Sequence, residues 1–376
     1  MPNDLFQHFI ECTDPYALFF IPKKNLGDKA FFFSSKMPLE KSKLHSLDKN
    51  PNLCAFGFLS FEKEPFFFET NLESIQSEDV SFTRELLNKK IQEEQSKKKF
   101  TVIKIENQES FSLWEKMLSM AKEKFNKLNH LKKIVLHRKI LLETNNPVSL
   151  NNLVATMPEI SDQHYFFLFK NHSEIIVSYS PETLCHYQNE KLTSLSLAGS
   201  TARDLQHPTE DQKLAEALLS DQKNLKEQNL VTERIKKDLS TFATELEIGP
   251  IYILKQKFVQ HLAQNITAHV PQQKIWSLIE VLHPTPALGG EPQKSALEVI
   301  REIEQSPRME YGASFGYILP NEIQLAVNIR CMKIQLNHNI ITLFGGCGIL
   351  EESVPHAEWI ETENKMRHFI KHFNSH

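Results

Sequence analysis

The chain has 376 residues, of which 40% are hydrophobic and 24% are charged. This composition is typical of a globular protein with a large core and excludes a disordered chain. Because 43 Lys and Arg side chains stand against 47 Asp and Glu side chains, the net charge is only −4, which argues against a broad nucleic-acid-binding surface.

The N-terminus and the cysteines predict a cytoplasmic protein. Met1-Pro2-Asn3-Asp4 lacks the order of basic and then apolar residues that begins a secretory signal. No stretch approaches the run of about 18 apolar residues that a membrane-spanning helix requires. The five cysteines are scattered, odd in number and without metal-ligand spacing, as expected of reduced thiols in a cytoplasm.

The first half of the chain predicts strands around one helix. Two phenylalanine triplets, at residues 31–33 and 66–68, are more typical of buried strands than of a binding surface. Apolar residues recur at helical spacing over residues 111–128, which predicts an amphipathic helix. Residues 133–142 then predict a strand, and residues 165–179 predict a β-hairpin.

The second half predicts helices in blocks, followed by strands and a last helix. No Gly or Pro occurs from residue 209 to residue 247, which predicts one long helical region. Further helices are expected near residues 272–282, 293–304 and 355–372, and strands near residues 313–319, 323–334 and 338–344. Strands in hairpins and helices in separate blocks favour an α+β fold over a regular βαβ alternation.

Glycine is rare and clustered in this chain. Its 11 glycines are about 3% of the residues, against roughly 7% in an average protein, and seven of them lie between residues 289 and 348. The run Gly345-Gly346-Cys347-Gly348 follows a predicted strand and precedes the last helix. Such a run either makes a tight turn or presents bare backbone N–H groups to a carboxylate or phosphate. It is not a GxGxxG fingerprint, and the preceding strands are predicted to be antiparallel, so a Rossmann fold is excluded.

Three charged residues share one face of the predicted last helix. Glu358, Glu361 and Lys365 stand at positions i, i+3 and i+7, which places them on the same side. On spacing alone, a solvated face with a Glu361–Lys365 pair is the simpler interpretation. The alternative is a pair of carboxylates that holds a hard cation beside a lysine for an anionic substrate.

Seven short motifs occur in a recognisable order along the chain. They are KIVLHR at residues 133–138, SPE at 180–182, LAGS at 197–200, HPTPALGG at 283–290, LAVNIR at 325–330, FGGCGI at 344–349 and EWIETENK at 358–365. Together they resemble the chorismate-utilising enzymes, and within that family most closely the isochorismate synthases. The resemblance covers residues 110–372, whereas residues 1–105 form a divergent N-terminal part. It implies one unit over residues 1–376, with a large antiparallel β-sheet core wrapped by α-helices.

The resemblance implies acid–base roles for two residues. Lys133 matches a lysine that takes a proton from water as the water attacks C2 of chorismate, and Glu182 matches an acid that protonates the departing C4 hydroxyl. Such a base needs a lysine pKa lowered from about 10.4 to about 7–8, and such an acid needs an apolar setting that keeps it protonated. Without the resemblance, Lys133 would be a solvated lysine at a strand start, and Glu182 would belong to a helix that begins with proline.

The resemblance also implies a Mg²⁺ ion and a set of substrate-binding residues. Glu227 and Glu361 match metal carboxylates, with Glu358 as a third, water-mediated contributor. Asn224 stands where relatives commonly carry an acid, which should weaken Mg²⁺ binding somewhat. The implied substrate-binding residues are Gly199, Ser200, His261, Thr285, Ala287, Tyr311, Arg330, Gly346, Gly348 and Lys365. Among them, Arg330 suits the enolpyruvyl carboxylate because its planar guanidinium forms two parallel hydrogen bonds with a carboxylate.

Three positions separate the branches of the family. Lys133 favours an enzyme that activates water over an anthranilate synthase, and Ala198 stands where aminodeoxychorismate synthases often place a nucleophilic lysine. The string at residues 283–288 is similar to isochorismate synthases and unlike salicylate synthases. We therefore expect an isomerase that converts chorismate to isochorismate for menaquinone or siderophore biosynthesis, as a monomer without a glutaminase subunit.

Three alternatives stay open at this point. The nearest is a salicylate synthase, which forms isochorismate and then eliminates pyruvate from it. The others are an aminating enzyme that works with a separate glutaminase, and a non-catalytic descendant that only binds the ligand.

Overall fold

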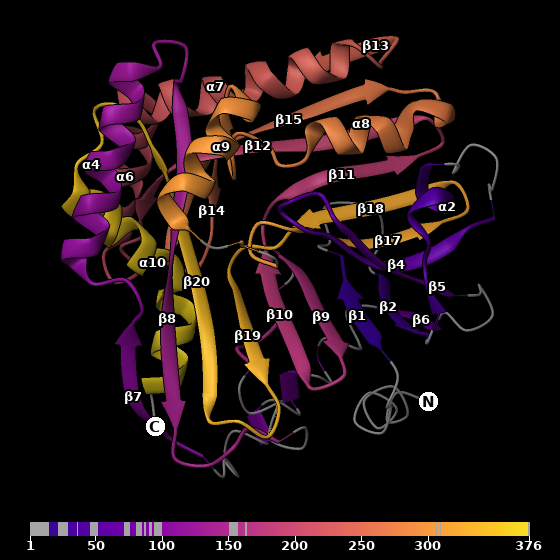
Figure 1. Ribbon diagram of the computed structural model, residues 1–376, viewed down its shortest axis with the longest axis horizontal. Helices are drawn as coiled ribbons and strands as arrows, with labels where there is room; N and C mark the ends of the chain where they lie inside the picture. The colour runs from indigo at the N-terminus through magenta and orange to yellow at the C-terminus, as the bar shows by residue number, and fades with distance from the viewer. Residues whose placement is uncertain are drawn as a thin grey trace.

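The computed structural model describes residues 15–21, 29–35, 37–45, 52–70, 76–79, 85, 88–89, 92–93, 100–149, 157–161, 164–305, 307–308 and 310–374. Within these residues the strands form two ten-stranded sheets, with helices packed against them (Figure 1). Each strand pair in the described part of the chain is antiparallel, which confirms the predicted α+β fold. Among the same residues, no helix is both long enough and apolar enough to cross a membrane.

The first sheet, sheet A, contains the strand that carries Lys133. Its order is β16-β8-β20-β19-β10-β9-β1-β2-β6, and β7 also pairs with β8. The bounds are β1 Tyr16–Phe20, β2 Lys29–Ser34, β6 Gln76–Asp79, β7 Val102–Asn107, β8 Lys133–Thr144, β9 Tyr165–Asn171, β10 Glu174–Ser180, β16 Gly290–Glu291, β19 Cys331–Gln335 and β20 Ile340–Ile349. The register pairs Gly346 with His137 and Gly348 with Val135, so the glycines of β20 lie beside the start of β8.

The second sheet, sheet B, combines three N-terminal strands with seven strands from after residue 182. Its order is β13-β15-β12-β11-β18-β17-β4-β5-β3, and β14 also pairs with β15. The bounds are β3 Met37–Pro38, β4 Cys54–Leu59, β5 Pro65–Thr70, β11 Thr183–Gln188, β12 Lys191–Ala202, β13 Glu245–Ile248, β14 Tyr252–Lys255, β15 Val259–His269, β17 Ser314–Leu319 and β18 Glu322–Val327. Because β10 ends at Ser180 and β11 begins at Thr183, the chain crosses from sheet A to sheet B at Glu182.

An aromatic cluster joins the two sheets. The rings of Phe167 in β9 and Phe315 in β17 stack with their centroids 4.1 Å apart, which links sheet A to sheet B. The triplet at residues 31–33 lies in β2, and its two outer rings are buried in this cluster. The triplet at residues 66–68 lies in β5, where Phe66 is 40% exposed and the next ring is buried. Both triplets therefore form strands, as predicted.

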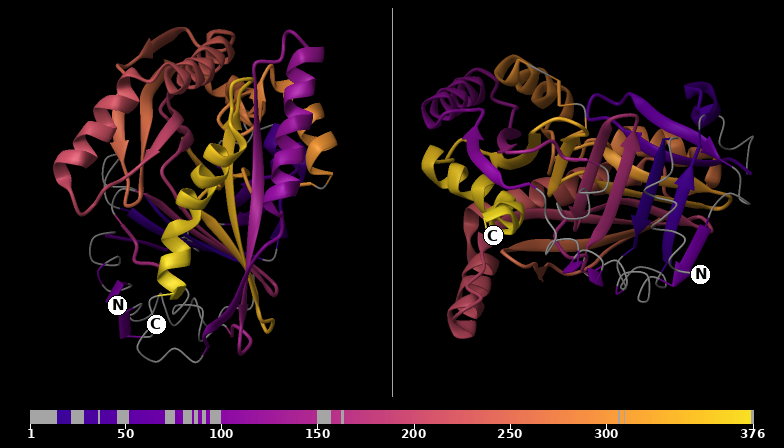
Figure 2. Two further views of the ribbon diagram at one scale, coloured as in Figure 1. Left: turned by 90° about the vertical axis from the view of Figure 1, so that its left-hand side faces the viewer. Right: turned by 90° about the horizontal axis from the view of Figure 1, so that it is seen from below.

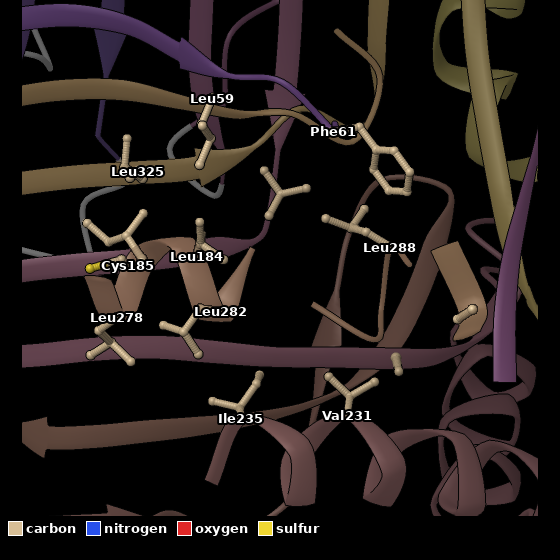
Figure 3. Close-up of a cluster of buried hydrophobic side chains, with 14 of the residues drawn as sticks. Leu59, Phe61, Leu184, Cys185, Val231, Ile235, Leu278, Leu282, Leu288 and Leu325 are labelled. Atoms are coloured by element: carbon tan, nitrogen blue, oxygen red, sulfur yellow. The ribbon is translucent and has the colours of Figure 1, made fainter. Parts of the chain in front are cut away.

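The helices pack mainly through aliphatic side chains. Their bounds are α2 Lys41–His45, α4 Phe111–Lys127, α6 Pro208–Ser220, α7 Gln222–Ser240, α8 Ile275–Leu282, α9 Gln293–Glu304 and α10 Pro355–Asn374, with a short 3₁₀ helix, η5, at Gln272–Lys274. Val231 and Ile235 of α7 share one cluster with Leu278 and Leu282 of α8 and with Leu184 of β11 (Figure 3). Helix α10 lies beside β20 and α4 (Figure 2). The helices predicted near residues 111–128, 272–282, 293–304 and 355–372 are confirmed.

The predicted long helix over residues 209–247 is wrong in two places. The chain breaks at Asp221, whose side chain accepts a hydrogen bond from the Asn224 N–H and caps the start of α7. An aspartate in this position competes with the backbone for the hydrogen bonds of a continuous helix. Helix α7 then ends at Ser240, and residues 245–248 form β13, which pairs with β15.

The predicted strand over residues 323–334 is also wrong, because it is two strands in different sheets. Strand β18 belongs to sheet B and β19 belongs to sheet A. The chain passes between them through Asn328, Ile329 and Arg330, and Arg330 has a φ of 51°. A left-handed conformation is uncommon for a residue other than glycine and marks this turn as a constrained position.

The glycine run lies inside β20 and not in a loop before the last helix. Strand β20 continues to Ile349 and keeps its register with β8 across all four residues from Gly345 to Gly348. The predicted tight turn is therefore wrong. The alternative, bare N–H groups for a carboxylate, stays a prediction, because β19 pairs only with residues 341–343 of β20 and the described strands pair with the glycine run on one side alone. The glycines do admit close neighbours, because a Cβ at Gly346 would lie 2.5 Å from the Tyr311 hydroxyl.

Candidate active site

A small cavity lies between the two sheets, closed by α7 and α10. Its volume is about 50 Å³. Of the residues that the sequence analysis assigned to catalysis, substrate binding or metal binding, all but Lys133, Thr285 and Glu358 line it. Those that line it are Glu182, Gly199, Ser200, Glu227, His261, Ala287, Tyr311, Arg330, Gly346, Gly348, Glu361 and Lys365. Residues that are far apart in the sequence thus meet at one place.

Lys133 lies behind the cavity wall and contacts Glu227. It is the first residue of β8, its side chain is fully buried, and its Nζ is 2.9 Å from Oε1 of Glu227 on α7. Burial acts to raise the pKa of the Glu227 carboxyl, but Lys133, Lys365 and Lys223 together hold that pKa below its usual value. Glu227 is therefore an ionised carboxylate.

Gly348 leaves the space that this ion pair fills. A Cβ at Gly348 would overlap Oε1 of Glu227 and would lie 2.8 Å from Cε of Lys133. Any larger residue on this side of β20 would displace both side chains.

Glu182 occupies the crossing between the two sheets. Its backbone N–H donates to Oγ of Ser180, and its carbonyl accepts from the N–H of Val327. The side chain is 2% exposed, and burial raises the pKa of the carboxyl to about 8, although Lys133, Lys365 and the Thr285 hydroxyl oppose this shift. Within the described residues no group donates to its Oε1, and the raised pKa makes Glu182 the carboxyl of the cavity best suited to hold a proton at neutral pH.

Helix α10 contributes a carboxylate, Glu361, and an ammonium, Lys365, to the cavity. A second carboxylate of the helix, Glu358, lies outside the cavity lining. Nζ of Lys365 is 2.7 Å from Oε1 of Glu361 and donates to the carbonyl of Gly346 at 2.9 Å. Glu358 is 1% exposed and forms an ion pair with Lys223 of α7. The spacing thus placed the three residues on one side of the helix, but only Glu361 and Lys365 reach the cavity.

Arg330 and His261 line the cavity beside Lys365 of α10. Nη2 of Arg330 is 2.9 Å from Nε2 of His261 in β15, and Nη1 donates to the carbonyl of Lys365. A guanidinium can only donate, so Nε2 of His261 is an acceptor. Burial and the charges of Arg330 and Lys365 hold the pKa of His261 well below its usual value. His261 is therefore a neutral side chain that orients Arg330.

The carboxylates of the cavity fit the donor chemistry of Mg²⁺. Glu227 and Glu361 both present oxygens to the cavity, and Mg²⁺ takes a few carboxylate ligands together with water and substrate oxygens. Across the described ranges, no group of three His, Cys, Asp or Glu side chains forms a site made of protein ligands alone. Glu227 and Glu361 would therefore hold the ion, whereas Glu358 does not line the cavity.

Asn224 supports β12 at Gly199 and Ser200, where the register of β12 with β15 shifts. Its Oδ1 accepts from the N–H of Ser200 at 3.0 Å, and its Nδ2 donates to Oδ1 of Asp221 at 2.7 Å. A carboxylate at this position could accept from Ser200 but could not donate to Asp221. The expectation that Asn224 weakens Mg²⁺ binding stays a prediction.

Sequence reasoning missed a buried network behind Tyr311. The ring of His137 stacks on Tyr311 with the centroids 5.1 Å apart, and Nδ1 of His137 is 2.9 Å from Oε1 of Glu304. Arg308 contacts the same carboxylate and donates to the carbonyl of Val135. Glu304 and Arg308 stand four residues apart, which in the sequence is indistinguishable from an ordinary surface pair.

Comparison with known proteins identifies the relatives of this fold and cavity. A family model described as chorismate binding enzyme matches residues 60–374. Isochorismate synthase MenF of Bacillus subtilis (strain 168) is 36% identical over 242 residues, which are 63% of this chain and 50% of that protein. Isochorismate synthase EntC of Escherichia coli (strain K12) is 32% identical over 253 residues, which are 65% of this chain and 63% of that protein. The matched part of this chain thus spans between half and two thirds of these relatives.

Solved structures with the same fold extend over nearly the whole chain. A putative 2,3-dihydroxybenzoate-specific isochorismate synthase, DhbC from Bacillus anthracis, has a TM-score of 0.80 at 22% identity and is matched over 99% of both chains. MenF, the menaquinone-specific isochorismate synthase from Escherichia coli, has a TM-score of 0.79 at 21% identity over 97% of this chain and 90% of that chain. At these identities the likeness establishes the fold.

Proposed function

The chain belongs to the family of chorismate-binding enzymes, and from that premise we propose that it is an isochorismate synthase that converts chorismate to isochorismate. The observation that carries the proposal is the geometry of two groups: the buried Glu182 carboxyl lines the cavity, and the buried Nζ of Lys133 lies against Glu227, which lines the same cavity. Glu182 has a pKa of about 8, and Lys133 lies close enough to oppose that shift. The curated relatives named isochorismate synthase support the same reaction.

The proposed reaction exchanges one hydroxyl for another without net change in composition. Water attacks C2 of chorismate and gives a proton to Nζ of Lys133. The ring double bonds shift, and the C4 hydroxyl leaves as water after it takes the proton of Glu182. General acid and base groups placed in this way each contribute about 10²–10⁴ in rate. Proton return between the two residues through solvent restores the starting state.

The two ends of the substrate would meet separate cations. Arg330 is held by His261 and by the carbonyl of Lys365, and the Lys365 ammonium contacts Glu361 and the carbonyl of Gly346. Chorismate carries one carboxylate on its ring and one on its enolpyruvyl group. We assign the enolpyruvyl carboxylate to Arg330, because a guanidinium binds a carboxylate through two parallel hydrogen bonds, and the ring carboxylate to the side of Lys365.

Glu227 has two tasks in this proposal. Its ion pair with Lys133 favours the ammonium form, whereas water activation requires the neutral amine. Lys133 therefore becomes a base only when Glu227 turns toward another cation. A Mg²⁺ ion held by Glu227 and Glu361 would neutralise negative charge on the ring carboxylate when it is bound.

Product analysis tests the proposal and separates it from its rivals. The purified protein is incubated with chorismate and Mg²⁺, with and without ammonium, and the products are separated by chromatography. We expect isochorismate to accumulate in both cases, and a chelator to stop turnover until Mg²⁺ is restored. Sustained salicylate fluorescence would identify a salicylate synthase, and ammonium-dependent anthranilate would identify an aminating enzyme.

The pathway that uses the product is a separate proposal. The relatives named above include a menaquinone-specific and a 2,3-dihydroxybenzoate-specific enzyme, and the second compound is a siderophore precursor by its catechol chemistry. We propose that the isochorismate enters one of these two routes. Loss of menaquinone or of catechol secretion in a deletion strain distinguishes them, and a strain that keeps both would contradict the assignment.

A further inference from the structure

Two cavities meet at Arg330. The catalytic cavity has a volume of about 50 Å³, whereas a second cavity, which we name the outer chamber, has about 360 Å³. The outer chamber is lined by residues 159–161, His164, Tyr179 of β10 and residues 256–258, and Arg203 also lines it. Arg330 lines both spaces, so the outer chamber lies next to the catalytic cavity and shares a cation with it.

The catalytic cavity is too small to receive the substrate as it stands. Pockets that hold small organic ligands have volumes of about 300–1,000 Å³. The space is occupied by the ion pairs of Lys133 with Glu227 and of Lys365 with Glu361. The outer chamber falls within the range for such ligands, so a cyclic dicarboxylate fits there before the ion pairs open.

The charges around the outer chamber favour an anion. Lys257 is exposed, its ammonium lies 5.7 Å from the Phe258 ring, and within the described residues it pairs with no carboxylate. Arg203 is neutralised by Asp211 at 2.6 Å, and Glu159 is the one carboxylate in the described lining. Lys257 and Arg330 therefore place two positive charges in the described lining against the one negative charge of Glu159.

The chamber also offers apolar surface for a ring. The Phe258 ring lies beneath the ammonium groups of Lys257 and Lys371. The Tyr179 hydroxyl donates to the carbonyl of Pro158 at 2.6 Å, which fixes residues 157–161 against β10. A ring with two carboxylates therefore finds an aromatic wall beside the cations that its charges require.

We propose that the outer chamber binds the dicarboxylate substrate first, with Lys257 attracting it and Arg330 guiding one carboxylate into the catalytic cavity. The identity of this dicarboxylate as chorismate rests on the proposed function. The step is binding alone, in which no covalent bond forms or breaks. Because attraction between exposed charges is screened by salt, the contribution of Lys257 should shrink as ionic strength rises.

A pair of charge-matched variants tests this role through kinetics. Lys257→Glu and Lys237→Glu each change the formal net charge by −2, from −4 to −6, but Lys237 lies on α7 in a separate surface groove. We expect Lys257→Glu to lower kcat/KM about three- to tenfold at low salt, with most of the change in KM, and to flatten its salt dependence. Equal effects of the two variants on kcat/KM would overturn the proposal, because they would reflect overall charge.

Equilibrium binding tests the same role without catalysis. Isophthalate, a stable aromatic dicarboxylate, is titrated into the full-length protein and into both variants by calorimetry. Weaker binding to Lys257→Glu than to Lys237→Glu supports the outer chamber even if the wild-type protein does not turn over chorismate, in which case only the proposed function fails. Equal affinities, or no binding to any of the three proteins, would contradict the outer chamber itself.

Discussion

Glu182 and Glu227 are two buried carboxyls of one cavity with opposite pKa shifts. Burial raises the pKa of Glu182 to about 8, because nearby lysines only partly offset the loss of solvent. Glu227 is as deeply placed, but contact with Lys133 keeps its pKa below the usual value. The fold thus separates a proton donor from an anion, because Lys133 forms an ion pair with Glu227, whereas burial has the larger effect at Glu182.

Removal of either acid–base side chain should abolish most turnover. Lys133→Ala and Glu182→Gln should each lower kcat at least about a hundredfold, the scale for loss of a general base or acid. Lys132→Ala is the matched control, because Lys132 is adjacent in sequence but exposed. Steady-state kinetics of the three variants checks this, and a Lys133→Ala rate within a few fold of the control would disprove the role of Lys133.

The raised pKa of Glu182 also predicts how stability depends on pH. The folded protein holds this proton up to about pH 8, whereas the unfolded chain releases it near the ordinary value of 4.5. Between these values the folded state binds more protons, so this group's contribution to stability falls as pH rises. The Tm of Glu182→Gln, compared with that of the wild type, should therefore rise by at least about 2 °C between pH 5 and pH 8. Parallel Tm curves for the two proteins would contradict the shift.

At the scale of residues, the motifs predicted the cavity better than spacing did. Glu361 and Lys365 reach the cavity, but Glu358 on the same side of the helix is buried against Lys223. Spacing cannot distinguish these outcomes, because it fixes the face of a helix and not its partner. The contact of His137 with Tyr311 carried no sequence signal, since it joins β8 to the turn before β17, which are 174 residues apart in the sequence.

At the scale of elements, sequence patterns located strands and helices but not where they end. The single helix over residues 209–247 and the single strand over residues 323–334 both contain a break made by a polar segment. Asp221 caps a new helix, and residues 328–330 carry the chain to the other sheet. Periodicity continues across both breaks. Asp221 is a local capping signal for the first, whereas the second follows from the pairing of β18 and β19 in different sheets. Both breaks position site residues. Glu227 is in α7, the helix that begins after the break at Asp221, and Arg330 is the last residue of the break between β18 and β19.

Strand β20 should tolerate no side chain at Gly348. Gly348→Ala would push Glu227 and Lys133 apart, and we expect kcat/KM to fall at least about tenfold while the protein stays folded. Gly249→Ala is the control, because its Cβ would meet its nearest atom at an ordinary 3.4 Å. Kinetics with near-UV circular dichroism checks both variants. Wild-type kcat/KM in folded Gly348→Ala would show that the ion pair needs no such space.

At the scale of the whole molecule, the N-terminal strands complete both sheets. Strands β1, β2 and β6 extend sheet A, and β3, β4 and β5 extend sheet B. The family resemblance covered only residues 110–372, because its motifs contain the residues at the cavity. The aromatic cluster that joins the sheets contains residues from strands in both the N-terminal part and the rest of the chain. The divergent N-terminal part therefore contributes packing that positions the site.

Loss of one ring between the sheets should destabilise the whole unit. Phe315→Ala removes a buried ring that stacks on Phe167, and we expect the free energy of unfolding to fall by about 3–5 kcal/mol. Phe66→Ala, at a ring that is 40% exposed, should cost about 1 kcal/mol or less. Urea unfolding measures both variants. A loss for Phe315→Ala no larger than for Phe66→Ala would show that the cluster does not hold the sheets together.

The most direct test of the account is the source of the new hydroxyl. The protein is incubated with chorismate and Mg²⁺ in H₂¹⁸O, and the product is analysed by mass spectrometry. Water activation by Lys133 with acid release by Glu182 predicts isochorismate that carries one ¹⁸O atom at C2. Isochorismate without ¹⁸O, or no isochorismate at all, would contradict the proposed reaction.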